Sequence, residues 1–325
     1  MKTLFLAAAA AALALGLIPS GVQAPELRPQ PILTIREAPQ AQPRTLRLLQ
    51  DGQVLSLDEE EYLTRVVLSE LPAQFDEQTM KAQAVAARTF YLRQAARGRH
   101  ADADVCAQSS CCQACLTRGE LEERLGQAFE EAWTRAGEAV AATKDEVLRY
   151  RDELIDATYF SCSGGRTEAA VAVWGGEVPY LQAVDSPGEE QAARYESRVV
   201  FSPQALAERL RAHGVEADFN TPPETWLGTL SRTDGGGVDT LRFCGTELGG
   251  VQLRSMLGLN STRFSVSYED GSFVFDVLGF GHRVGMSQYG AQAMAEAGFD
   301  YRAILLYYYP GVQIEKVPCA ESAGQ

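Results

Sequence analysis

The chain has 325 residues, 46% of them hydrophobic, and a formal net charge of −14 at pH 7. A chain of this length and composition can bury a sizeable core and is expected to form one or two globular domains, which excludes a disordered or fibrous protein. The acidic charge argues against a protein that binds nucleic acid through its phosphates, and is otherwise a common property of soluble surfaces.

The chain begins with one lysine ahead of a long apolar run that closes on small residues, MKTLFLAAAAAALALGLIPSGVQA. This pattern is typical of an export signal, so residues 1–24 are predicted to be a signal peptide. Cleavage and retention as an anchor both stay open, because Pro25 would follow the cut. No further transmembrane segment is expected, and the protein should be exported to the periplasm or to the cell wall and extracellular space.

Residues 25–45 are rich in Pro and Gln and are predicted to be a linker. The next stretch, LRLLQDGQVLSL, alternates apolar and polar residues and has an Asp-Gly turn signal at Asp51, which predicts a hairpin. Ser56 and Glu59 then have the spacing of a capping box, so a helix is predicted to begin there. Its end is expected just before Pro72, which disfavours helical conformation in the preceding residue.

A second helix is predicted from about Glu77 to Arg97, with Asp76 as its N-cap, and a third over residues 120–143. Helices and hairpins mix along the chain, which predicts an α+β fold. Further expected elements are a hairpin over 147–165, a capped helix over 202–214, a strand pair around the Gly-rich turn at 233–237, a hairpin over 262–279 turned at Asp270, and a helix that ends at Gly298.

The composition of the chain changes between about residues 186 and 259, where a capped amphipathic helix and a Gly-rich strand pair follow one another. We therefore expect residues 186–259 to be an inserted, smaller α/β subdomain. The parts before and after it, 46–185 and 260–318, are expected to form one main core.

The first predicted helix has a carboxylate in line with its apolar face. Leu63, Val66 and Val67 stand at i, i+3 and i+4, and Glu70 stands at i+7. A carboxyl group there would be partly desolvated, which raises its pKa and suits it to act as a general acid. From the pattern alone, Glu70 could equally cap the helix end or pair with a cation at the edge of the core.

Two other features of the sequence, a pair of cations and two Gly-rich loops, could contribute to a site. Lys81 and Arg88 are seven residues apart on the second helix and so share a face, where they could hold Glu70 ionised, bind a polar substrate or simply face solvent. Two Gly-rich loops could bring the backbone close to a ligand. FSCSGGRTE contains Ser163 and Thr167, and GFGHRVGMSQYGA contains His282.

Three long blocks, in order along the chain, resemble the SpoIID/LytB family of cell-wall proteins. They are EEYLTRVVLSELPAQFDEQTMKAQAVAARTFYL, SCSGGRTEAAVAVWGGEVPYL, and GHRVGMSQYGAQAMAEAG with YYYPGV. The resemblance runs roughly from Leu46 to Ile314 and implies an α+β catalytic core with an inserted or docking subdomain. It also implies lytic transglycosylase activity, in which the MurNAc–GlcNAc bond of peptidoglycan glycan strands, stripped of stem peptides in SpoIID-type enzymes, is cleaved to 1,6-anhydro products.

The resemblance also assigns expected roles to residues. Glu70 matches the catalytic glutamate of the family, which would protonate the glycosidic oxygen and then accept a proton from the C6 hydroxyl. Expected substrate-binding residues, by their place in family motifs, are Lys81, Arg88, Ser163, Thr167, His282, Gln288 and Tyr289. One departure is Arg283, which stands where the family usually has glycine after the histidine.

Two other functions stay open. An exported protein resembling LytB could be a non-catalytic wall-binding protein or an enhancer of a cell-wall amidase, which would then be its partner. A two-carboxylate glycosidase with Glu168 as the second carboxylate would instead leave hydrolysed, reducing ends.

A cysteine-rich segment follows the second predicted helix. In clostridial-type SpoIID proteins a similar spacing of His, Cys, His and Cys holds zinc, which implies a site made by His100, Cys106, Cys111 and Cys112. Four protein ligands leave no open position, so the zinc would be structural. Disulfides are the alternative, because an exported chain normally oxidises its thiols. The remaining cysteines, Cys115, Cys162, Cys244 and Cys319, could form up to two disulfides, and a catalytic thiol at Cys162 has no histidine near it in sequence.

Overall fold

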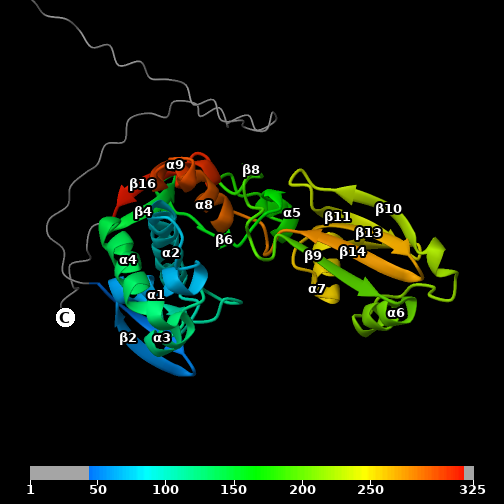
Figure 1. The fold of residues 1–325 in the computed structure, drawn as a ribbon, viewed down its shortest axis with the longest axis horizontal. Coiled ribbons are helices and arrows are strands. Elements are labelled where there is room, and N and C mark those ends of the chain that lie inside the picture. Colours follow the sequence, from blue (N-terminus) through cyan, green and yellow to red (C-terminus); the bar gives the residue numbers. More distant parts are fainter. Residues whose placement is uncertain (1–43, 318–325) are drawn as a thin grey trace, which may run out of the picture. The chain divides into compact units, whose positions relative to one another are not determined.

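The computed structural model describes residues 44–317 (Figure 1). The signal peptide predicted at 1–24, nearly all of the linker predicted at 25–45, and Cys319 lie outside the described residues. Within the described part the fold is α+β, as predicted, and its small sheets are mostly antiparallel. None of the helices between residues 44 and 317 is long and apolar enough to cross a membrane.

The described chain begins with the predicted hairpin, made by β1 (Thr45–Gln50) and β2 (Gln53–Asp58). Its turn residue Asp51 has a positive φ of 51°. The tight turns that match the twist of paired strands require this conformation, and Asp and Gly adopt it most readily. The Asp-Gly signal therefore predicted the turn correctly.

Helix α1 (Glu59–Glu70) ends where it was expected to, with Leu71 as its C-cap just before the proline. The capping box predicted for its start is wrong. Ser56 lies inside the hairpin opposite Arg47, because β2 continues to Asp58. The carboxylate of Asp58 caps the helix instead, accepting hydrogen bonds from two backbone N–H groups of the first turn.

Helix α2 (Glu77–Arg97) has the predicted bounds and is buried on opposite faces. Ala84 and Ala87 belong to a first core, formed mainly by α1 and by residues 129–140. Ala82 and Ala86 belong to a second core, formed mainly by C-terminal residues between Val284 and Ile314. Small side chains let neighbouring elements approach both faces of α2, so this helix joins the N-terminal and C-terminal parts of the chain.

The third predicted helix is broken in two. Helix α3 (Arg118–Leu125) and helix α4 (Phe129–Ala142) are separated by a short 3-10 turn that begins at Gly126. Gly126 has φ 53° and ψ −126°, which lies outside the helical region and is open mainly to glycine. The apolar periodicity continued across this residue, which is why the sequence predicted one helix.

The hairpin predicted over 147–165 is much shorter than expected. After β5 (Glu153–Leu154) the chain runs on to β6 (Tyr159–Phe160), which pairs in parallel with β15 (Met286–Ser287). This pairing places the two predicted Gly-rich loops side by side.

Other elements of the first two cores are β3 (Val105–Cys106), β4 (Glu146–Tyr150), β7 (Gly165–Arg166), α5 (Ala170–Trp174), β8 (Asp185–Ser186), α8 (Gln288–Glu296), α9 (Tyr301–Tyr308) and β16 (Gln313–Lys316).

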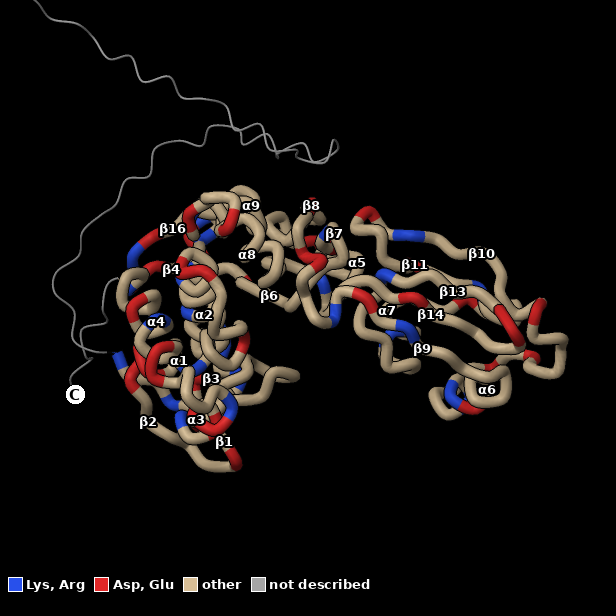
Figure 2. Tube along the Cα trace, in the orientation of Figure 1, with Lys and Arg blue, Asp and Glu red and all other residues tan. Residues whose placement is uncertain are grey.

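A third core lies between residues 196 and 278 and is rich in stacked and edge-on aromatic rings, among them Trp226 and Phe273. The hairpin turned at Asp270 forms as predicted, but it pairs with β9 and packs into this core, although it was expected to join the main core. The elements here are β9 (Glu196–Phe201), α6 (Pro203–Ala212), a 3-10 turn (Pro223–Thr225), β10 (Leu227–Arg232), β11 (Val238–Phe243), β12 (Thr246–Gly249), α7 (Gly250–Leu257), β13 (Arg263–Glu269) and β14 (Ser272–Leu278). Acidic and basic residues are both found in this part of the chain and are scattered among its elements (Figure 2).

Candidate active site

Glu70, the last residue of α1, lies at a pocket and is held by two hydrogen bonds. Its Oε1 accepts from the backbone N–H of Ala114 at 3.1 Å, and its Oε2 accepts from Nε2 of Gln288 at 3.4 Å. Burial raises the pKa of the Glu70 carboxyl above its usual value, and the two hydrogen bonds, which favour the ionised form, offset this only in part. Glu70 therefore keeps its proton at a higher pH than a free carboxyl group does.

The pocket beside Glu70 has a volume of about 510 Å³ and combines aromatic faces with few charges. Among the described residues that line it, Glu70 has the only carboxylate, and Arg254 is the only arginine or lysine. The lining residues are Glu70, Phe90, Ser109, Cys112, Thr158, Tyr159, Phe160, Ser161, Arg254, Phe280, Gly281, His282 and Gln288.

A larger cavity of about 800 Å³ lies on the sheet formed by β9, β13 and β14. Two of its charged residues, Arg198 and Asp276, neutralise each other in a two-bonded ion pair. The two carboxylates that line it, Glu196 and Asp276, are exposed or half-buried, so neither is desolvated as Glu70 is. The smaller pocket at Glu70 is therefore the better candidate for acid–base chemistry.

His282 lines the Glu70 pocket as a neutral ring. Burial, and secondly the positive charge of Arg254, lower the pKa of His282 to about 4. Its Nδ1 accepts a hydrogen bond from the backbone N–H of Val284 at 3.1 Å, so the neutral ring carries its proton on Nε2. Rings of Phe160 and Trp174 lie 5.5 and 5.4 Å from the imidazole ring, centroid to centroid. His282 therefore brings no charge to the pocket, and both ring nitrogens face backbone groups, those of Val284 and Tyr159.

The cysteine-rich segment forms part of this site, which the sequence did not reveal. Ala114 supplies a backbone donor to Glu70, and Cys112 lines the pocket. Between them, Gln113 is buried and bonds to the hydroxyls of Tyr62 and Tyr159 at 3.0 and 2.6 Å. Ala114 and Glu70 are 44 residues apart in sequence, and no local pattern links them.

His100, Cys106, Cys111 and Cys112 come together as one cluster, whose four possible ligand atoms all lie within 4.8 Å of one another. His100 Nε2 is 3.3 Å from the Cys112 sulfur and 3.8 Å from the Cys111 sulfur, and these two sulfurs are 4.0 Å apart. None of the six cysteines between residues 44 and 317 forms a disulfide. The cluster could bind a metal ion.

Lys81 and Arg88 do not line the pocket. Arg88 is fully buried between α2 and α4, where it donates to the backbone oxygens of Thr143 and Glu146 and lies 3.7 Å from the carboxylate of Glu59. Lys81 pairs with Glu77 on its own helix. Arg88 therefore holds the first core together and has no surface for a ligand, contrary to the expectation from sequence.

Ser163 and Thr167 are also fully buried and bond to the protein itself. The Ser163 hydroxyl donates to Glu189, and the Thr167 hydroxyl accepts from the backbone N–H of Val184 at 2.8 Å. Tyr289 packs edge-on against Phe75. Of the residues expected to bind substrate, only His282 and Gln288 share the pocket with Glu70.

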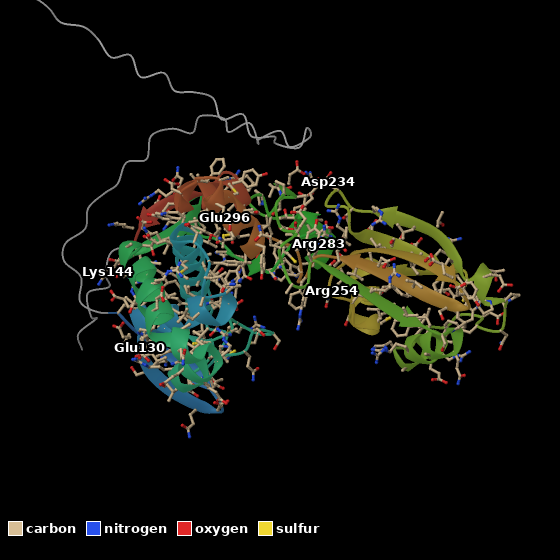
Figure 3. All side chains as sticks on the ribbon, in the orientation of Figure 1. Glu130, Lys144, Asp234, Arg254, Arg283 and Glu296 are labelled. Atoms are coloured by element: carbon tan, nitrogen blue, oxygen red, sulfur yellow. The ribbon has the colours of Figure 1, made fainter. Side chains whose placement is uncertain are left out.

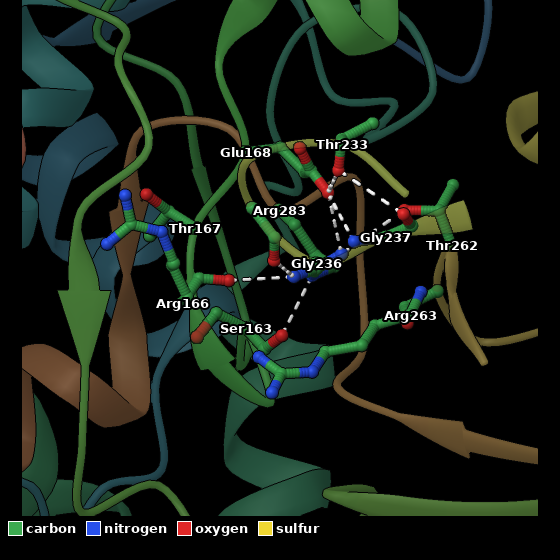
Figure 4. Close-up of polar contacts among 12 residues, drawn as sticks. Ser163, Arg166, Thr167, Glu168, Thr233, Gly236, Gly237, Thr262, Arg263 and Arg283 are labelled. Atoms are coloured by element: carbon green, nitrogen blue, oxygen red, sulfur yellow. Dashed lines mark hydrogen bonds and ion pairs between the residues drawn. The ribbon is translucent and has the colours of Figure 1, made fainter. Parts of the chain in front are cut away.

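Arg283, next to His282, lies at the centre of a buried network that Figure 4 shows. Its φ is 67°, a conformation that favours glycine. Its guanidinium group donates to Glu168 Oε1 at 3.0 Å and to the backbone oxygens of Ser163, Arg166 and Gly235 at 2.7–2.8 Å. Burial lowers the pKa of Arg283 to about 10, although Glu168 opposes this shift.

The same network excludes Glu168 from the pocket and fixes the Gly-rich turn between β10 and β11. Glu168 is 1% exposed, accepts from the backbone N–H of Gly237 at 2.9 Å, and does not line the pocket, so the structure gives no support to a second catalytic carboxylate there. A Cβ atom on Gly237 would lie 2.4 Å from Glu168 Oε1, so only glycine fits this close approach.

Replacing Arg283 by glycine is expected to destabilise the protein by about 3 kcal/mol, because Glu168 would remain buried without its cation. Breaking the ion pair alone would lower the free energy of unfolding by more than this. Glycine offsets part of the loss, because it adopts a positive φ without the strain of about 1 kcal/mol that Arg283 carries. Urea denaturation monitored by circular dichroism measures it. Arg198→Gln, which breaks an exposed and solvent-screened ion pair, should leave the urea midpoint almost unchanged. Equal losses in both variants would contradict the expectation.

Comparison with known proteins identifies relatives of the chain. Residues 50–150 match the model of the family SpoIID, described as Stage II sporulation protein. The chain is 35% identical over 260 residues to Stage II sporulation protein D of Bacillus subtilis (strain 168), covering 79% of this chain and 74% of that protein. The corresponding protein of Bacillus amyloliquefaciens is 34% identical over 288 residues, 87% of this chain and 81% of that protein. The amidase enhancer of Bacillus subtilis (strain 168) is 28% identical over 315 residues, 78% of this chain and 40% of that protein.

Proposed function

Since the chain belongs to the SpoIID family, we propose that it is an exported cell-wall protein that cleaves peptidoglycan glycan strands as a lytic transglycosylase. The observation that carries this proposal is Glu70, a single carboxyl group with a raised pKa in a pocket lined by aromatic rings. A single carboxyl group is sufficient for this reaction, whereas ordinary glycosidases need two.

In the proposed reaction, protonated Glu70 donates its proton to the glycosidic oxygen between N-acetylmuramic acid and N-acetylglucosamine. The bond to the anomeric carbon breaks, and positive charge develops on the muramic acid ring. Ionised Glu70 then accepts the proton of the C6 hydroxyl as this oxygen bonds to the anomeric carbon, giving the 1,6-anhydro sugar and restoring the acid. The N–H groups of Ala114 and Gln288 stabilise the ionised carboxylate between these steps.

We also propose that the cluster of His100, Cys106, Cys111 and Cys112 holds a structural zinc ion. Tetrahedral zinc with usual bond lengths sets its sulfur ligands about 3.8 Å apart, and a nitrogen and a sulfur ligand about 3.6 Å apart. The separations between 3.3 and 4.0 Å among His100, Cys111 and Cys112 are close to these values. Bound there, zinc would fix the segment that presents Ala114 to Glu70.

Product analysis tests the proposed activity. Purified protein is incubated with peptide-stripped glycan strands, and the new ends are identified by mass spectrometry. We expect 1,6-anhydro ends. Reducing ends would mean a hydrolase, and intact strands that are nevertheless bound would mean a non-catalytic wall protein. In that last case, stimulation of a purified cell-wall amidase would favour a role like the one named for the amidase enhancer relative.

A further inference from the structure

Arg254 is a half-buried cation without a partner. It comes from α7, whereas Glu70 comes from α1, and both line the same pocket. Among residues 44–317 no carboxylate or carbonyl oxygen accepts a hydrogen bond from its guanidinium group; Figure 3 labels this residue. Burial lowers its pKa, and no nearby anion opposes this. Arg88 and Arg283, the fully buried arginines, are by contrast bonded to several oxygens.

Neither His282 nor Glu70 compensates this charge. His282 is neutral, and the raised pKa of Glu70 favours its protonated form. A cation that has lost part of its hydration and gained no partner is costly, and an anionic ligand group would remove the cost. A guanidinium group is best matched by a carboxylate, which can accept two parallel hydrogen bonds from it.

The substrate of the proposed function carries such a group. N-acetylmuramic acid has a lactyl substituent whose carboxyl group is an uncharged amide while a stem peptide is attached and a free carboxylate once the peptide is removed. Resting on the proposed function, we propose that Arg254 binds the lactyl carboxylate and thereby makes the protein select peptide-stripped strands. Arg254 is then a specificity-determining residue that contributes to binding, and Glu70 remains the acid.

The test compares two strands that differ only in this charge. One is peptide-stripped glycan with free carboxylates, and the other is the same glycan with its carboxylates converted to methylamides. For the native protein, kcat/KM should be roughly 10- to 100-fold higher on the carboxylate strand, the range for a charge-assisted hydrogen bond, and the difference should lie mainly in KM. Arg254→Gln should bring this ratio close to one, and Arg254→Lys should restore part of it.

The matched control is Arg242→Gln, which removes an exposed arginine of β11 in the same core and should keep the native ratio. A native ratio near one, or a ratio unchanged in Arg254→Gln, would overturn the inference while leaving the proposed activity intact. If the native protein cuts neither strand, the proposed activity fails, and calorimetric titration of both strands still tests Arg254. Preference of the native protein, but not of Arg254→Gln, for the carboxylate strand would then support the binding role, and equal binding would refute it.

Discussion

Glu70→Gln is expected to lower kcat/KM for glycan cleavage by about 10²- to 10⁴-fold, the usual contribution of a general acid–base group. Gln is close in size to Glu and can still bond to Ala114, but it cannot donate a proton to the leaving oxygen. The rate of formation of anhydro ends measures the effect. The melting temperature should change little, because the substitution removes a partly desolvated carboxyl group rather than a buried apolar side chain.

Glu61→Gln is the matched control for this experiment. Glu61 is an exposed residue of the same helix, and its substitution should leave the cleavage rate within twofold of the native rate. If Glu70→Gln were to cut as fast as Glu61→Gln, another group would have to be the acid, and the proposed mechanism would be wrong.

Loss of the metal cluster is expected to have the largest effect on stability. Cys106→Ser removes one buried sulfur of the cluster, and metal analysis should show about one zinc ion per native chain and almost none in the variant. Zinc present at about a thousandfold over its Kd stabilises the folded state by about 4 kcal/mol. The variant loses this stabilisation, so its melting temperature should be lower than that of the native protein by about 8 °C or more. Cleavage should fall too, because the segment that presents Ala114 to Glu70 would no longer be fixed.

Cys244→Ser is the control for the metal prediction, since Cys244 is half-buried and lies outside the cluster. It should keep both the zinc and the native melting temperature. The prediction would be contradicted if the native protein contained no metal and melted at the same temperature as Cys106→Ser. Free-thiol counting would then show whether disulfides take the place of the metal.

Local signals predicted the elements whose ends are set by a few neighbouring residues. The N-cap Asp76 and the left-handed C-cap Gly98 fix the ends of α2, and Asp51 and Asp270 mark two hairpin turns. The apolar stripe likewise placed Glu70 at the edge of the core. These features depend on contacts within a few residues, which is the range that a sequence pattern describes.

Contacts between distant segments could not be predicted in this way. Arg88 was expected on an open face, yet α2 is covered on opposite sides. The alanines of this helix were the available signal, because small residues at so many positions indicate close neighbours in several directions. Arg254 gave no signal at all, since its importance depends on the pocket that it shares with Glu70.

The two hydrogen-bond partners of Glu70, Ala114 and Gln288, are 44 and 218 positions away from it in the chain. Contacts over such long separations form late, because the loop between the partners must close first. A chain that is still being synthesised or exported therefore has its acid without Gln288, and the pocket without His282. The site is completed only when the last part of the fold docks on α2, so an unfinished chain cannot hold the assembled pocket.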